Sequence, residues 1–502
     1  MSILKKIVNN LIAPGGTLSQ RVVKSGFWVF FLRIFSQGFG LLRLIILARI
    51  LSPSDFGVMG IALLTMSILE TFSETGFQHA LIQKKENIKS YLDSAWTVLI
   101  LRGFVLFVIL YFIAPYAAVF FNTPEAKPII RVIGFSILFQ AFTNIGITYF
   151  KKELEFIKEF IYQLTGTLAD FIVAISAVLI LRNVWALVFG LLAGNITRCF
   201  VSYLIHPYKP RLYFALEKVK ELFGFGKWIL GSSILIFLLG QGDDIFVGKL
   251  LGATMLGFYQ LAYRISNMPA TEITHVISQV TYPAYSKLQD DLPKLRESYL
   301  KVLQVTAFLS FPIAGLIFVL APDFTRIFLG EKWMPMVLPM QVFCILGALR
   351  SIAAASGPIF LALGRPDFET KISAAELALL AILIYPLTIK WGITGTAISI
   401  SIVSCSFIFI VLSIVIKLTK MEKSEMLKLT QCISFPLLSI IPLFPMKMFI
   451  LKPLMGNDIL FFCVTILTDI FIYLISMLIL DRYSSHYNLV TNLKYTLKIV
   501  RT

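Results

Sequence analysis

The chain has 502 residues, of which 57% are hydrophobic and only 15% are charged. Soluble domains carry about 25% charged residues, and the shortage here extends along the whole chain, which excludes a soluble enzyme with a single anchor. The net charge of +17 does not indicate nucleic-acid binding, because the lysines and arginines stand in short groups between apolar segments, as in membrane proteins. We therefore expect an all-α membrane protein with no nucleic-acid partner.

Apolar segments long enough to cross a bilayer recur from residue 24 to residue 480. One crossing needs about 20 predominantly apolar residues. The segments predict 14 transmembrane helices, at 24–50, 54–81, 93–121, 126–150, 158–181, 184–206, 222–250, 254–282, 297–321, 335–363, 370–389, 392–416, 427–450 and 457–480. The second and eighth are the least apolar.

The basic residues predict the orientation of these helices. With the N-terminus inside and alternating crossings, most of the 45 lysines and arginines fall in the inside segments. This predicts a multi-pass protein with both termini cytoplasmic, in tails at 1–20 and 481–502. The predicted outside loops are short, so we expect no external catalytic domain and no enzyme activity.

The five cysteines lie in apolar segments and form no CxxC pair. Small buried thiols of this kind are ordinary core residues. We therefore expect no metal site, no disulfide framework and no cofactor.

An internal repeat relates the two halves of the chain at an offset of 200 residues. The offset aligns segment 47–57 with segment 247–257, Gly26 with Gly226, Trp28 with Trp228, and Gly40 with Gly240. Each half contains six predicted helices, so both enter the membrane from the same side as parallel repeats. This predicts an N-lobe at 21–206, a basic cytoplasmic linker at 207–221 and a C-lobe at 222–417. We expect a pseudo-two-fold axis along the membrane normal, with the helices of 418–480 as an addition.

Charged residues inside the predicted helices are the candidate site residues. A charge at the bilayer centre costs about 2.5–3.5 kcal/mol on insertion scales, so these groups must pair, reach the interface or line a wet cavity. Helical periodicity places several of them on shared faces. The predicted substrate-binding residues are Arg33, Gln37, Arg43, Glu70, Glu74, Arg264 and Arg350. The predicted ion-coupling residues are Asp243, Asp244, Glu70 and Glu272.

The repeat gives Arg43 and Asp243 equivalent positions, so we expect them to face each other across a central cavity. An arginine there can grip a diphosphate with two hydrogen bonds, and an acid can carry a coupling ion. Structural pairing between helices is the alternative reading of the same charges. For Arg102, Arg131 and Arg198, near helix ends, the structural reading is preferred.

Segments 26–62 and 259–291 resemble the polysaccharide-exporter branch of the multidrug/oligosaccharidyl-lipid/polysaccharide superfamily, as do GEKW at 330–333 and LALGRPD at 361–367. The resemblance implies a flippase that moves an undecaprenyl-diphosphate-linked oligosaccharide, such as an O-antigen, capsule or exopolysaccharide repeat unit, to the outer leaflet of a bacterial inner membrane by alternating access. It also implies coupling to protons or sodium, contact with membrane lipids and with polysaccharide polymerase and export machinery, and function as a monomer.

Two other functions remain open on the residues alone. A multidrug antiporter of the same superfamily shares the 12-helix core and normally lacks the last two helices. A membrane glycosyltransferase or polymerase needs an external loop rich in acids or arginines, which the short outside loops do not offer.

Overall fold

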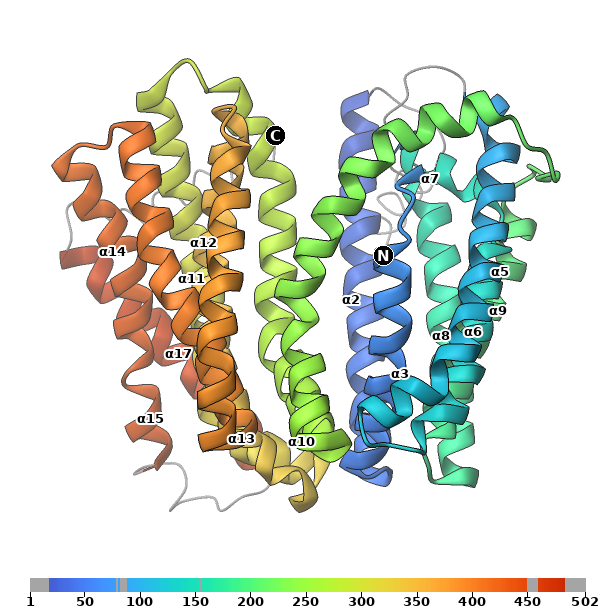
Figure 1. Ribbon diagram of the computed structural model, residues 1–502. Coiled ribbons are helices and arrows are strands. Elements are labelled where there is room, and N and C mark those ends of the chain that lie inside the picture. Colours follow the sequence, from blue (N-terminus) through green and yellow to red (C-terminus); the bar gives the residue numbers. More distant parts are fainter. Residues whose placement is uncertain (1–17, 78–79, 82–87, 154, 449–458, 484–502) are drawn as a thin grey trace, which may run out of the picture. The chain divides into compact units, whose positions relative to one another are not determined.

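The protein is described by a computed structural model that covers residues 18–77, 80–81, 88–153, 155–448 and 459–483. All regular secondary structure in these residues is helical (Figure 1), which confirms the predicted all-α class. The predicted tails lie almost wholly outside the described residues. By internal contacts the chain divides into unit 1, Met1–Gly257, and unit 2, Phe258–Thr502.

Helices of unit 1 lie side by side as a bundle (Figure 1). Its main helices are α2 (Leu18–Ile50), α3 (Pro53–Phe72), α5 (Lys89–Phe120), α6 (Ala126–Ala141), α8 (Phe156–Leu181), α9 (Trp185–Ile205) and the first part of α10 (Leu216–Lys287). Two short helices, η1 (Ile145–Ile147) and α7 (Thr148–Lys152), connect α6 to α8. The α2, α8 and α9 helices pack successively against one another, and α5 packs against α6.

Unit 2 is built around α11 (Leu292–Phe324), against which α12 (Val337–Ala362), α14 (Lys423–Ile440) and α17 (Ile459–Tyr483) pack. The other elements are the last part of α10, η2 (Thr325–Leu329), η3 (Glu331–Met336), α13 (Pro366–Thr419) and α15 (Leu443–Met446). Tyr299 of α11 is fully buried in the core and shares a hydrogen bond of 2.9 Å with Ser356 of α12. Tyr473 of α17 donates to the Phe308 carbonyl at 2.9 Å. The helices predicted as an addition thus pack on the core of unit 2.

Eight helices in the described residues are long and apolar enough to cross a membrane. A ninth span is formed if Ala126–Phe142 and Ile145–Lys152, bent by 66°, are counted as one. The chain is therefore a multi-pass membrane protein. Helix α3 passes this test but is the least apolar of the eight. It forms the first part of the second predicted span, 54–81, and ends earlier than predicted, at Phe72. The crossing of the membrane by α2, α10 and α14 stays a prediction.

Two helices are too long for one crossing, and both are broken. Helix α10 has 72 residues and a non-helical Gly252 with φ +82°. Helix α13 has 54 residues and a break at Trp391 and Gly392, where Gly392 has φ +58°. Glycine occupies this left-handed region without steric cost. Both breaks fall in the short gaps predicted between spans, after residues 250 and 389.

The start of α3 is fixed by a capping box. Asp55 accepts the backbone N–H of Ser52 at 2.9 Å, and Ser52 Oγ accepts the N–H of Asp55 at 3.2 Å. Pro53 at the first helical position has no N–H to satisfy. The second oxygen of Asp55 accepts the N–H of Val184 at 3.0 Å, so the same side chain also ties α3 to the start of α9.

Within unit 1, α3 and the segment after the α10 break approach each other reciprocally. A Cβ on Gly57 would lie closer than 3.0 Å to the carbonyl of Ala253, and one on Gly257 would lie closer than 3.0 Å to the carbonyl of Pro53. Gly57 and Gly257 are equivalent in the repeat, as are Pro53 and Ala253. A contact in which each partner offers the same surface is the mark of two-fold symmetry.

Candidate functional site

One charge pair inside the helices joins α2 to α8. Arg43 Nη2 lies 3.0 Å from Asp170 Oδ1, and the two side chains are only 19% and 25% exposed. The rings of Phe39 and Phe171, 5.3 Å apart, pack between the same two helices. A guanidinium buried in this way depends on its acid, because an uncompensated charge in an apolar bundle is costly. Arg43, predicted to bind substrate, is therefore also held by a structural partner.

Glycines bring α8 and α9 close enough to extend this pair into a larger polar group. A Cβ on Gly190 would lie 2.5 Å from Asp170 Oδ1, and one on Gly194 would lie 3.1 Å from Asp170 Cβ. The spacing of Gly190 and Gly194 is the small-xxx-small pattern that lets transmembrane helices pack closely. This pattern is visible in the sequence and marks the place where α9 meets Asp170.

Asn195 and Arg198 of α9 complete the group. Arg198 Nη1 donates to Asn195 Oδ1 at 3.2 Å. Arg198 Nε and Asn195 Nδ2 are buried and have no hydrogen-bond partner among the described residues. We call Arg43, Asp170, Asn195 and Arg198 the Arg43 cluster. It presents unused donors inside a helical bundle, which is the chemistry needed to hold an anionic group.

A second group lies where α3 ends against α5. Arg102 Nη2 donates to the carbonyl of Glu70 at 2.7 Å, and its Nε donates to the carbonyl of Ser73 at 2.7 Å. The guanidinium also lies within electrostatic range of the Glu70 and Glu74 carboxylates. Arg102 thus caps the C-terminus of α3, where unpaired carbonyls and the helix dipole favour a cation.

We expect Arg102→Ala to destabilise the protein by about 1.5–3 kcal/mol, because two charge-assisted hydrogen bonds to α3 are lost. The melting temperature of the purified protein measures this. Arg131→Ala is the matched control, since Arg131 makes one longer bond of 3.3 Å to the Tyr111 carbonyl. Equal falls in the melting temperature of the two variants would show that the α3 cap stabilises the protein no more than the single bond of Arg131 does.

In unit 2, Arg350 of α12 donates to the hydroxyl of Tyr263 and lies 5.7 Å from the centre of its ring. Glu376 of α13 is within electrostatic range of Arg350. Arg264, next in the chain, is exposed on α10. Arg350 therefore has a defined aromatic and acidic environment that spacing alone did not reveal.

The remaining predicted site residues are placed as follows. Asp243 is buried on α10, while Asp244 and Gln37 are partly buried. The side chains of Arg33 and Glu272 lie outside the described part of the chain. The opposition of Arg43 and Asp243 across a cavity, and the binding roles of all these residues, stay predictions. In the described segments, no three His, Cys, Asp or Glu side chains are grouped so as to hold a metal ion.

Comparison with known sequences links the chain to one family. The sequence model of the family described as polysaccharide biosynthesis protein matches residues 46–338. The chain is 26% identical over 363 residues to the lipopolysaccharide biosynthesis protein WzxC of Escherichia coli K12, covering 71% of this chain and 73% of the relative. It is 27% identical over 328 residues to the teichuronic acid biosynthesis protein TuaB of Bacillus subtilis, covering 63% and 68%.

Solved structures share the fold at low sequence identity. The lipid II flippase MurJ in an inward closed conformation has a TM-score of 0.74 and 16% identity, covering 92% of this chain and 99% of that one. An inward-facing multidrug resistance transporter of the MATE family has a TM-score of 0.59 and 15% identity, covering 83% and 98%. At these identities the likeness concerns the fold alone.

Proposed function

Because the chain belongs to the polysaccharide biosynthesis protein family, in the polysaccharide-exporter branch of its superfamily, we propose that it is a flippase rather than an enzyme. Its cargo is an undecaprenyl-diphosphate-linked oligosaccharide, moved from the inner to the outer leaflet of a bacterial inner membrane. The observation that carries the proposal is the family match through residues 46–338, from the end of α2 to the start of α12.

The fold supports transport of a lipid-linked substrate. Among solved structures, the lipid II flippase MurJ shares the fold over 92% of this chain, and a flippase carries out the same class of movement. The chain's many apolar helices fit a protein embedded in the membrane. We propose 14 crossings with both termini cytoplasmic, a count that includes α2, both halves of α10, and α14.

We further propose that the repeats form two lobes related by an axis along the membrane normal, joined through the linker 207–221. The reciprocal approach of Gly57 to Ala253 and of Gly257 to Pro53 supports this, since symmetric repeats meet through equivalent positions. Transport then occurs by rocking of the lobes about a fixed site near the bilayer midplane.

In this mechanism the diphosphate binds cations while the polyprenyl chain stays in lipid. Arg43 is the first candidate, because its cluster holds buried donors. The predicted residues Arg33, Gln37, Glu70, Glu74, Arg264 and Arg350 contribute the rest of the cavity wall. A proton or sodium ion on Asp243, Asp244, Glu70 or Glu272 resets the cycle, and no other cofactor is needed.

The site assignment is tested by single alanine variants of Arg43, Asp243 and Glu70 at normal expression. We expect each to reduce surface polysaccharide while the lipid-linked intermediate accumulates on the inner leaflet. The amounts of polysaccharide and of intermediate are measured in the same cells. Full export by all three variants would refute the assignment.

A multidrug antiporter is the second candidate, because a MATE transporter shares the fold with a TM-score of 0.59. That function predicts drug resistance on expression and unchanged surface polysaccharide on deletion. A drug-efflux assay beside the polysaccharide assay separates the two.

A further inference from the structure

Residues 207–215, which we call the strap, connect α9 to α10 and have no regular secondary structure. The strap follows the first turns of α5, whose side chains accept its backbone N–H groups. The bonds are Arg211 to Asp93 at 2.8 Å, Tyr213 to Thr97 at 3.0 Å and Ala215 to Ser94 at 3.1 Å. Lys218, just beyond the strap, donates to the Ser90 carbonyl at 2.8 Å. Side chains of α5 therefore hold an extended segment in one position.

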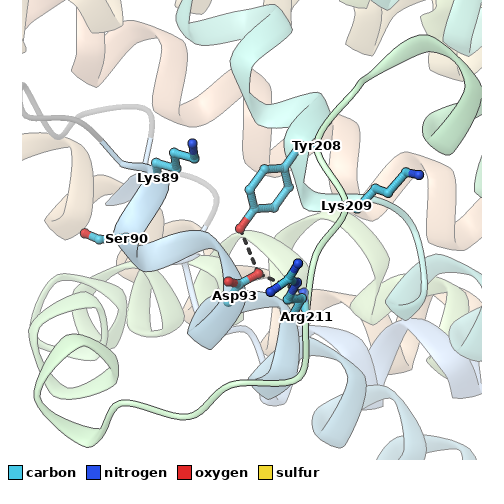
Figure 2. Close-up of a pocket in the computed structure, with 6 residues that line it drawn as sticks. All are labelled: Lys89, Ser90, Asp93, Tyr208, Lys209 and Arg211. Atoms are coloured by element: carbon cyan, nitrogen blue, oxygen red, sulfur yellow. Dashed lines mark hydrogen bonds between the residues drawn. The ribbon is translucent and has the colours of Figure 1, made fainter.

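A pocket of about 620 Å³ opens between the strap and the start of α5 (Figure 2). The lining residues are Lys89, Ser90, Asp93, Tyr208, Lys209 and Arg211. Its volume lies within the range of about 300–1,000 Å³ that small-molecule sites occupy. Three of the six lining side chains are cationic and one is acidic, so the pocket has an excess of positive charge.

The one acid in the pocket is engaged by the protein itself. Asp93 Oδ1 accepts the Tyr208 hydroxyl at 2.7 Å and the backbone N–H of Arg211 (Figure 2). Burial raises the pKa of Tyr208, and the hydrogen bond to Asp93 raises it further, so the phenol remains a donor. Asp93 thus fixes the strap, while Lys209 and Arg211 form no ion pair in the described residues.

The backbone of α5 adds to this positive field. The helix begins at Lys89, its N-cap Ile88 provides no side-chain hydrogen bond, and its first turn contains no acid. The N–H groups of a first helical turn and the helix dipole favour an anion at such an end. With the cations of the strap, they favour a phosphate group.

Exposed apolar side chains beside the pocket indicate that the phosphate belongs to a lipid. Leu212 is 73% exposed, Tyr213 56% and Phe214 54%. They directly follow Arg211. Basic residues followed by aromatic and aliphatic ones are typical of a segment at the membrane interface, with cations at headgroup level and apolar groups in the acyl region.

We propose that Lys89, Lys209 and Arg211 bind the phosphate or diphosphate headgroup of a membrane lipid in this pocket, on the predicted cytoplasmic side. The site goes beyond the proposed function, because it lies in the strap and not among the charges within the helices. Either an anionic phospholipid or a polyprenyl diphosphate supplies the required chemistry.

The test measures binding of fluorescent phosphatidylglycerol to the purified full-length protein in detergent. We expect K209Q/R211Q to bind about thirtyfold more weakly, since each of the two basic residues near the surface contributes about 1 kcal/mol and every 1.4 kcal/mol is tenfold. The strap remains tied in this variant, because Arg211 donates to Asp93 through its backbone. The charge-keeping variant K209R/R211K should bind as the parent does. Unchanged melting temperatures without added lipid check the fold.

The matched control is K287Q/K417Q, which removes two exposed cations from the same predicted face outside the pocket. Unweakened binding by K209Q/R211Q, or equal weakening in the control, would overturn the proposal. Competition by undecaprenyl diphosphate or by unlabelled phosphatidylglycerol identifies the lipid class. If inorganic diphosphate competes as well as either lipid, the ligand is not a lipid headgroup and the proposal is wrong. Transport is not part of the assay, so the proposed function can stand or fail independently.

Discussion

Replacing Arg43 with alanine is expected to reduce export and to destabilise the protein, whereas the double variant R43A/D170A should recover stability without recovering export. The single change removes the guanidinium 3.0 Å from the carboxylate of Asp170, which is 25% exposed. Removing one member of a buried ion pair costs about 3–5 kcal/mol, while replacing both members by apolar groups is often neutral. If Arg43 also binds the diphosphate, removing Asp170 cannot restore that function.

Melting temperatures of the purified variants and surface polysaccharide in cells are measured together. Lys301→Ala is the control, because Lys301 forms an exposed ion pair with Glu297, and such a pair is worth about 0–1 kcal/mol. Export by R43A/D170A at the parental level would show that Arg43 serves only to balance Asp170. The proposed role of Arg43 in cargo binding would then be wrong, although Arg43 would still form its ion pair with Asp170.

The Arg43 cluster shows what sequence alone can and cannot predict about this site. Hydropathy identifies Arg43, Asp170 and Arg198 as charges within apolar helices, because the cost of burying a charge makes each one conspicuous. Helical period then gives the face that a residue occupies, but not the helix that lies opposite. The repeat offset pointed from Arg43 to Asp243 because it identifies equivalent positions, and equivalence is not contact.

The strap illustrates the same limit for a loop. Its basic composition predicts a cytoplasmic linker at 207–221. Nothing in the spacing of Asp93, Ser94 and Thr97 shows that they receive the N–H groups of a segment more than one hundred residues away. The chain breaks at Gly252 and Gly392 were easier to place, because turn signals are local.

The close approach of α3 to the segment after the α10 break gives the other large expected effect. Gly57→Ala and Gly257→Ala should each destabilise the protein by about 1–3 kcal/mol and reduce export, because an added methyl group overpacks a tight contact. In both cases the obstacle is a backbone carbonyl, of Ala253 or of Pro53, which cannot rotate away as a side chain can. Because the two glycines are equivalent in the repeat, we expect the two variants to lose similar amounts of stability and of export.

Gly240→Ala is the matched control, since a Cβ at Gly240 would meet nothing within 4 Å. Alanine is favoured over glycine in a helix by about 1 kcal/mol, so this variant should melt at or above the parental temperature and export normally. If only one of the Gly57→Ala and Gly257→Ala variants lost stability, the contact would not be symmetric. If neither variant lost stability, the close approach would be refuted. Similar losses in both, with an intact control, would mean that the two repeats meet through the same pair of positions, as a two-fold axis requires.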